Sequence, residues 1–150
     1  MPNAYVSLVY HVVFSTKKRH PWIAPALADR LYPYLGAAIE GEGGRPIRIG
    51  GVKDHVHILA HFRQDRALSE SLKKIKSGST FWIHATFPEL KRFAWQEGYA
   101  AFTVSQSCVP AVSDYIARQE EHHKKKTFQE ELEEIFERHG IRPDPRFFDR

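Results

Sequence analysis

Cysteine is almost absent from this chain of 150 residues, which contains only Cys108. A single thiol cannot form an intrachain disulfide, so the reducing interior of a cell is the expected compartment, and we predict a cytoplasmic protein. Apolar runs are also short, and none approaches the roughly 20 residues that a membrane-spanning helix requires. The N-terminus lacks the basic segment of a secretory signal, and Tyr5 to Phe14 alternates like a strand. These absences argue against a secreted disulfide-rich protein and against a membrane partner.

The overall composition is that of an ordinary globular protein with a basic charge balance. Hydrophobic residues make up 42% of the chain, and its length suffices to bury a core, so we predict one domain spanning residues 1–150. The net charge is +4 and the pI is near 9.2, which permits a polyanionic partner without requiring one. The acidic residues gather late, in a segment that we interpret as solvated: Glu130, Glu131, Glu133, Glu134 and Glu137.

The pattern of apolar residues predicts an α+β fold. Alternation indicates strands near residues 6–14, 47–52, 55–61 and 99–104. Helical spacing indicates helices near residues 25–39, 68–83, 109–119 and 127–138. With one helical crossover in each half, this order matches a ferredoxin-like, RRM-like split βαβ antiparallel sheet with strand order 4-1-3-2. We predict helices on one face of the sheet, an added C-terminal helix, and a bulge at Gly50-Gly51.

The stretch from Asp54 to Leu59 carries the clearest chemical signal. His55 and His57 are two residues apart on a predicted strand, so their side chains project from one face. Two imidazoles on a rigid strand supply two ligands of an open divalent-metal site. A bound Mg²⁺ or Mn²⁺ would suit phosphate chemistry, because it polarises a phosphoryl oxygen. The spacing alone is equally compatible with a half-exposed surface pair.

A second stretch, from Tyr115 to Gln119, lies in a predicted helix. These two residues are four positions apart and therefore share one helical face. The Tyr115 hydroxyl could attack a phosphate, and the Gln119 amide oxygen could complete a metal site with His55 and His57. The second stretch thus strengthens the metal interpretation of the first.

Together the two stretches resemble the small single-tyrosine transposases of the HUH superfamily. The group is that of the bacterial 200/605 insertion sequences and their domesticated repeat-associated relatives. His-hydrophobic-His on a strand, followed by Tyr-Ile-x-x-Gln on a later helix, carries the resemblance, which covers nearly the whole chain. Further matching segments are residues 14–19, 76–79, 95–99 and 115–128.

The resemblance implies a metal-dependent nuclease and strand transferase that acts on single-stranded DNA with hairpin ends. His55, His57 and Gln119 would hold Mg²⁺ or Mn²⁺, and Tyr115 would attack the scissile phosphate. The products would be a 5′-phosphotyrosine and a free 3′-OH, and this covalent step needs no nucleotide cofactor. The resemblance also implies a homodimer, in which the tyrosine helix of one subunit lies against the histidine pair of the other.

Further candidates surround this centre. Asp54 is most simply a turn residue, and its alternative role is to orient an imidazole through a hydrogen bond. His11 is expected to be structural, with a similar orienting role if its strand neighbours that of His55. His122 and His123 are expected to be exposed to solvent, and their alternative is a ligand role in competition with Gln119. The predicted DNA contacts, for which solvation is the alternative, are Lys17, Lys18, Arg19, Lys73, Lys76 and Ser77.

Other functions fit parts of the sequence. A non-catalytic single-stranded nucleic-acid-binding module of ferredoxin-like fold would stack bases on aromatic residues of its central strands, where this chain has His55 and His57. A domesticated repeat-processing nuclease would cut DNA without mobilising its own gene. A relaxase or replication initiator uses the same chemistry, but no helicase domain is visible here. A two-histidine phosphoesterase requires Thr or Ser two residues after each histidine, and Leu59 occupies that position after His57.

Overall fold

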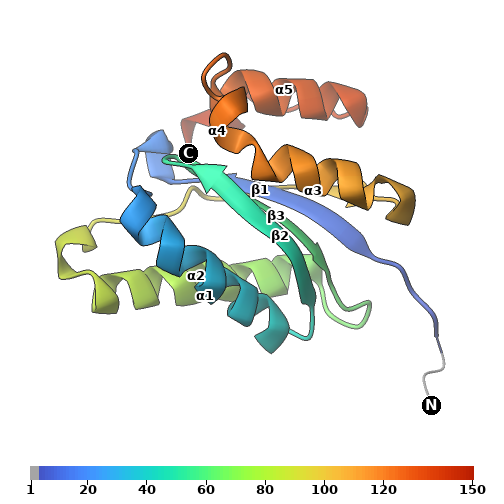
Figure 1. The fold of residues 1–150 in the computed structure, drawn as a ribbon, viewed down its shortest axis with the longest axis horizontal. Coiled ribbons are helices and arrows are strands. Elements are labelled where there is room, and N and C mark those ends of the chain that lie inside the picture. Colours follow the sequence, from blue (N-terminus) through green and yellow to red (C-terminus); the bar gives the residue numbers. More distant parts are fainter. Residues whose placement is uncertain (1–3) are drawn as a thin grey trace.

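The computed structural model describes residues 4–150 and contains a four-stranded sheet between two layers of helices (Figure 1). The strands are β1 (Val9–Ser15), β2 (Arg45–Val52), β3 (His55–His61) and β4 (Ala100–Val104). The helices are α1 (Pro25–Gly41), α2 (Leu68–Thr86), α3 (Val109–Ala117), α4 (Gln119–His122) and α5 (Phe128–Arg138). None of the helices within residues 4–150 combines the length and apolar character that crossing a bilayer requires.

The sheet is antiparallel, in the order β2-β3-β1-β4. This is the predicted order 4-1-3-2 counted from the other edge, so the prediction of an α+β ferredoxin-like sheet is confirmed. β1 and β3 are the central strands, and their register pairs Ser15 with His55 and Val13 with His57. The strand that carries the two histidines therefore lies in the middle of the sheet.

Each face of the sheet has its own apolar core, because alternate residues of a strand point to opposite faces. On one face, Phe14 and its neighbours pack with residues of α1 and α2. On the other face, Leu59 packs with α3 and Val13 packs with α5. Figure 1 shows α3 and α5 on the side of the sheet opposite to α1 and α2. The two crossover helices share one face as predicted, and the C-terminal helices cover the other. His55 and His57 have the same parity as Leu59, so their side chains lie beneath the C-terminal helices.

The helix predicted for residues 109–119 is interrupted. α3 ends at Ala117 and α4 begins at Gln119, while Arg118 between them has φ −105° and ψ 24°. The prediction of one uninterrupted helix from Tyr115 to Gln119 is therefore wrong. Both side chains nevertheless reach the same carboxylate, that of Glu131 in α5.

Gly50 allows the end of α3 to lie directly on β2. Gly50 and Gly51 pair in register with His57 and Val56, and the irregularity of this ladder lies between Pro46 and Arg48. The predicted bulge at the two glycines is therefore wrong. A Cβ atom at position 50 would lie 2.8 Å from the backbone oxygen of Ile116. The glycine is required by this close approach of two backbones.

We expect Gly50→Ala to destabilise the protein by about 1–3 kcal/mol, because the added methyl group must displace α3 from the sheet. Gly36→Ala, in α1, is the matched control, since the atoms nearest to a Cβ there are 3.7 and 3.8 Å away. Alanine favours a helix over glycine by roughly 0.5–1 kcal/mol, so this control should be neutral or stabilising. Urea denaturation measures both variants. Equal free energies of unfolding would show that the packing of α3 tolerates a side chain at position 50.

Candidate active site

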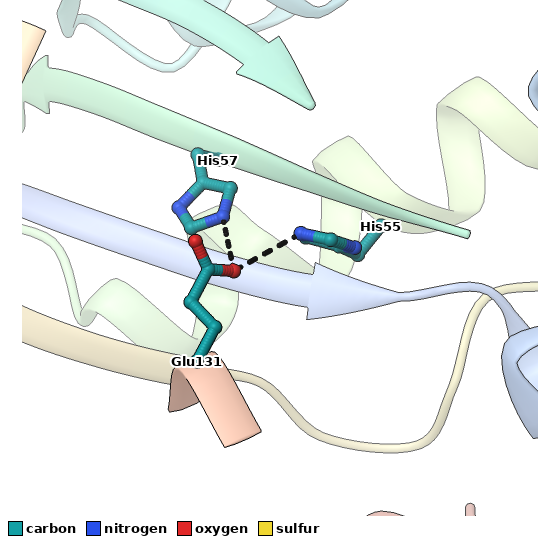
Figure 2. A group of neighbouring side chains, drawn as sticks. All are labelled: His55, His57 and Glu131. Atoms are coloured by element: carbon teal, nitrogen blue, oxygen red, sulfur yellow. Dashed lines mark hydrogen bonds and ion pairs between the residues drawn. The ribbon is translucent and has the colours of Figure 1, made fainter. Parts of the chain in front are cut away.

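The histidine pair of β3 is buried at the centre of the protein. His55 and His57 are both 0% exposed, because the segment from α3 to α5 covers this face of the sheet. Their Nε2 atoms lie 3.2 and 3.1 Å from Oε1 of Glu131, whose side chain extends from α5 toward both rings (Figure 2). The interpretation of the two histidines as a half-exposed surface pair is therefore wrong.

Glu131 is the residue that sequence reasoning missed. Its place in the late acidic segment predicts a solvated side chain, but Glu131 is 2% exposed. The signal was present in the sequence, because Glu131 lies three residues after Phe128 and four before Ile135, on the apolar face of α5. A carboxylate on the buried face of a helix requires partners, since burying a charge without them is costly.

Tyr115 and Gln119 complete this centre within the same chain. The Tyr115 hydroxyl donates a hydrogen bond to Oε2 of Glu131, and Nε2 of Gln119 donates to the same oxygen at 2.8 Å. The amide oxygen of Gln119 lies 3.1 Å from Nε2 of His55. The ring centres of Tyr115 and His57 are 5.9 Å apart. The structure thus brings together all four residues that the sequence singled out, around a fifth that it did not.

The outer nitrogens of both histidines are held by neighbouring side chains. Nδ1 of His55 donates to Oδ1 of Asp54 at 2.7 Å, and Nδ1 of His57 lies 2.7 Å from Nε2 of His11. β1 is the neighbour of β3, which is the condition under which His11 was expected to orient an imidazole. These contacts fix the rings so that both Nε2 atoms face Glu131, as the outer hydrogen bonds of metal-binding histidines do.

The last residue of α4 and the first residue of the connection to α5 add two more imidazoles. His123 was expected to be exposed, but it is half-buried, and its Nε2 lies 3.0 Å from Oε1 of Glu131 and 3.1 Å from Oε1 of Gln119. His122 stacks on the Tyr115 ring with a centroid distance of 4.5 Å. The contact of His123 with Glu131 exists because the chain turns back after α4 and places α5 over the same face of the sheet.

Burial and the nearby carboxylates set the protonation of the histidines. Burial alone disfavours the charged imidazole, but hydrogen bonds to Asp54 and Glu131 outweigh it and raise the pKa of His55 to about 9. Burial dominates at the other two rings, where it lowers the pKa of His57 to about 4 and that of His11 to about 3. At neutral pH His57 is therefore uncharged, which is the form of the ring that binds metal ions.

The pKa of Tyr115 and the pKa of Glu131 are shifted in opposite directions. Burial, together with the negative charge of Glu131, raises the pKa of the Tyr115 hydroxyl well above its usual range. Burial would raise the pKa of Glu131, but hydrogen bonds from His123, His55 and His57 outweigh it and hold that pKa far below its usual range. In this arrangement the proton stays on Tyr115 and Glu131 stays ionised.

The donor atoms at this centre fit a divalent metal ion. Ligand atoms of His55, His57 and Glu131 all lie within 4.8 Å of one another. Both nitrogens of His55 face only oxygen acceptors, since Nδ1 faces Asp54 and Nε2 faces Glu131 and Gln119. Such a ring needs either a second proton or a cation in front of Nε2. Imidazole nitrogens with carboxylate and amide oxygens form a suitable ligand set for a divalent cation.

The first group of predicted DNA contacts lies beside this centre. Lys18 and Arg19 line a groove with a volume of about 1190 Å³, and Lys17 is exposed next to them. Asp54 and His123 line the same groove. The groove therefore connects the basic loop after β1 with residues that contact the buried cluster.

The second group lies on α2. Lys73, Lys76 and Ser77 line a separate groove with a volume of about 650 Å³. Nζ of Lys76 donates to the carbonyl oxygens of Gln96 at 2.7 Å and Gly98 at 2.6 Å, and burial lowers the pKa of Lys76 to about 8. Lys76 thus ties α2 to the loop before β4, and a DNA contact by this group of residues stays a prediction.

This fold and this centre define a class: a ferredoxin-like protein with a buried histidine pair, a tyrosine and acid groups suited to a divalent metal. Solved structures share the fold. A Deinococcus radiodurans R1 protein described as a transposase matches with a TM-score of 0.65 at 26% identity, over 79% of this chain and 96% of that one. A REP-associated tyrosine transposase bound to a REP hairpin matches with a TM-score of 0.59 at 15% identity, over 82% and 74% of the two chains.

The family model of IS200-like transposases matches residues 4–119. The chain belongs to this family, as the sequence motifs predicted, and is a DNA-processing enzyme of the transposase class. The ISDra2 transposase TnpA of Deinococcus radiodurans is 27% identical over 117 residues, which cover 75% of this chain and 84% of that protein. Glu131 and the lysines of residues 124–126 follow the segment that the family model matches.

Proposed function

We propose that this protein is a metal-dependent nuclease and strand transferase acting on single-stranded DNA, with Tyr115 as the nucleophile. One observation carries the proposal: Tyr115, Gln119, His55 and His57 all contact the same buried carboxylate of Glu131. A hydroxyl nucleophile beside candidate metal ligands is the arrangement that phosphoryl transfer requires. Membership of the IS200-like transposase family supports the same chemistry.

The metal ligands in this proposal are His55 and His57, joined by an oxygen of Gln119 or of Glu131. When bound, Mg²⁺ or Mn²⁺ polarises a phosphoryl oxygen and neutralises charge in the transition state. The two imidazoles favour Mn²⁺ over Mg²⁺, because Mg²⁺ prefers oxygen ligands. Asp54 and His11 keep the two rings oriented through their Nδ1 atoms.

The covalent step is a displacement at phosphorus. A bond forms between the Tyr115 oxygen and the phosphorus atom, and the bond from phosphorus to the 3′ oxygen breaks. The Tyr115 hydroxyl loses its proton along its hydrogen bond to Glu131, and the leaving 3′ oxygen takes up one proton, so the products are a 5′-phosphotyrosine and a 3′-OH. Because one phosphodiester bond replaces another, rejoining reverses the step without a nucleotide cofactor.

Glu131 influences whether the proposed nucleophile, Tyr115, keeps its proton. Its Oε2 atom accepts the hydrogen bond of the Tyr115 hydroxyl. While Glu131 carries its full negative charge, a phenolate beside it would place two like charges in a buried site, so the proton stays on the tyrosine. A divalent cation held by the two imidazoles and Glu131 would offset that negative charge, so we expect Tyr115 to react only when the metal is bound.

The substrate in this proposal is DNA with hairpin ends. The REP-associated transposase with the same fold was solved with a REP hairpin bound. A homodimer is also proposed, because joining two ends needs two cleavages and each chain supplies one Tyr115.

Covalent trapping tests the proposed function directly. Purified protein is incubated with end-labelled single-stranded DNA and Mg²⁺ or Mn²⁺, and the products are separated under denaturing conditions. We expect a metal-dependent adduct in which the label on the 5′-phosphate side moves with the protein. A chain that binds DNA but forms no adduct with either metal would contradict the proposal.

We also expect the site to be complete within one chain. Tyr115 contacts its own chain's Glu131 and lies beside its own His57, unlike the composite site that the resemblance implies. Co-expression of differently tagged Tyr115→Phe and His57→Ala chains separates the two arrangements. With sites in cis every site keeps one defect, and a purified mixed dimer should show no activity. Recovery of part of the wild-type activity would establish exchange of the tyrosine helix between subunits.

A further inference from the structure

The groove beside the active site collects positive charge from two distant parts of the chain. One part is the loop after β1 with the β2–β3 turn, and the other is the connection between α4 and α5. Its cationic lining residues are Lys18, Arg19, Lys53, Lys124, Lys125 and Lys126. The volume of about 1190 Å³ exceeds the roughly 300–1,000 Å³ of small-molecule pockets, so the shape suits an extended ligand.

The groove is continuous with the active site. Asp54 lines it and accepts a hydrogen bond from His55 at 2.7 Å. His123 lines it from the other part of the chain and lies 3.0 Å from Glu131. A ligand in the groove would contact Asp54 and His123, and each of these side chains contacts the cluster of His55, Glu131 and Tyr115 directly.

The charges of the groove are largely available to a ligand. Lys53, Lys124 and Lys125 are exposed, and none of them forms an ion pair with any residue between 4 and 150, whereas Lys126 is paired with Glu134. The carboxylates that line the groove are Asp29, Asp54, Glu120 and Glu130. Two of these four are already engaged, since Asp54 binds His55 and Glu130 caps α5.

The basic loop after β1 has an unusual backbone conformation that holds its side chains in place. Lys18 and Arg19 are consecutive non-glycine residues, and each has φ of 57°. This left-handed conformation is sparsely populated for residues with a side chain and persists where surrounding contacts impose it. Lys18 is held there by hydrogen bonds to the C-terminal segment, from its backbone amide to Arg150 at 3.2 Å and from Nζ to Asp149 at 3.0 Å.

We propose that this groove carries the single DNA strand that leads to Tyr115, and that Lys124 and Lys125 contact its phosphates. The inference rests on the proposed function and adds the path of the substrate. A duplex cannot present a phosphate to a cluster buried beneath α4 and α5, whereas a single strand can enter a cationic groove. Both lysines lie beyond residues 4–119, so the contact belongs to a part of this chain that the family model does not cover.

Salt-dependent DNA binding tests the path without relying on cleavage. Anisotropy titrations with a fluorescent single-stranded oligonucleotide, at a series of salt concentrations, compare the Tyr115→Phe protein with the same protein carrying Lys124→Gln and Lys125→Gln. The matched control carries Lys91→Gln and Arg92→Gln, which remove the same charge from exposed residues outside the groove lining. Thermal melting verifies that all three proteins are folded.

We expect the groove variant to lose affinity about tenfold at low salt, with the control unchanged. The slope of log affinity against log salt should fall in magnitude by about 1.4, because each lost phosphate contact on a single strand removes about 0.7. The inference would be overturned if the groove and control variants lost equal DNA affinity. It would also be overturned if neither variant changed the slope of log affinity against log salt. If the parent protein shows no salt-dependent binding to single strands, the proposed function itself fails.

Discussion

Tyr115→Phe is expected to abolish formation of the covalent DNA adduct while leaving DNA binding nearly intact. The substitution removes one oxygen atom, the proposed nucleophile, and keeps the ring that stacks on His122 at 4.5 Å. Loss of an essential nucleophile lowers a reaction rate by at least about 10³-fold, so no adduct should be detected. Denaturing gels measure the adduct, and anisotropy measures binding with the same oligonucleotide.

A second tyrosine provides the control for this experiment. Tyr34 stacks on Trp82 between α1 and α2, on the face of the sheet opposite to the cluster. Tyr34→Phe removes a hydroxyl of the same kind and should leave adduct formation unchanged. A Tyr115→Phe protein that still becomes covalently attached to DNA would show that another residue is the nucleophile.

His57→Ala is expected to reduce the affinity for Mn²⁺ by at least about 100-fold. Loss of residues that only orient metal ligands already costs 10–100-fold, and His57 is itself a proposed ligand. His55→Ala should have the same effect, since the Nε2 atoms of both rings face the same oxygen of Glu131. Isothermal titration calorimetry measures the affinity, and the covalent assay should show parallel loss of metal-dependent cleavage.

Because His57 is fully buried, its removal also takes away the hydrogen-bonding partner of His11 and one of the several partners of Glu131. Circular dichroism is needed to verify that each variant is folded before its metal affinity is interpreted. His84→Ala is the control, because His84 bonds the carbonyl oxygen of Phe93 at 2.9 Å, outside the cluster. Unchanged Mn²⁺ affinity in folded His55→Ala and His57→Ala proteins would contradict the proposed metal site.

Local patterns in the sequence determined the sheet and the candidate site residues. Alternation defined β3 and put His55 and His57 on one face, because the side-chain period of a strand is two. The order of strands and crossover helices predicted the sheet topology, because few arrangements satisfy the rules of strand connection. Tyr115 and Gln119 were recognised by their spacing of four residues in a helical pattern, and both side chains reach Glu131 although the helix is interrupted at Arg118.

Only the tertiary structure decided what surrounds these residues. The bend at Arg118 and the return of α5 bring Glu131 and His123 into contact with His57 and His55 of β3, far away in the sequence. Spacing along one element cannot encode such a contact, because it depends on how two elements pack. The charge pattern alone placed Glu131 in solvent, and its burial follows from α5 turning its apolar face, with Phe128 and Ile135, toward the sheet. Lys124 and Lys125 line the same groove as Lys18 for the same reason, because the packing of two distant segments brings them together.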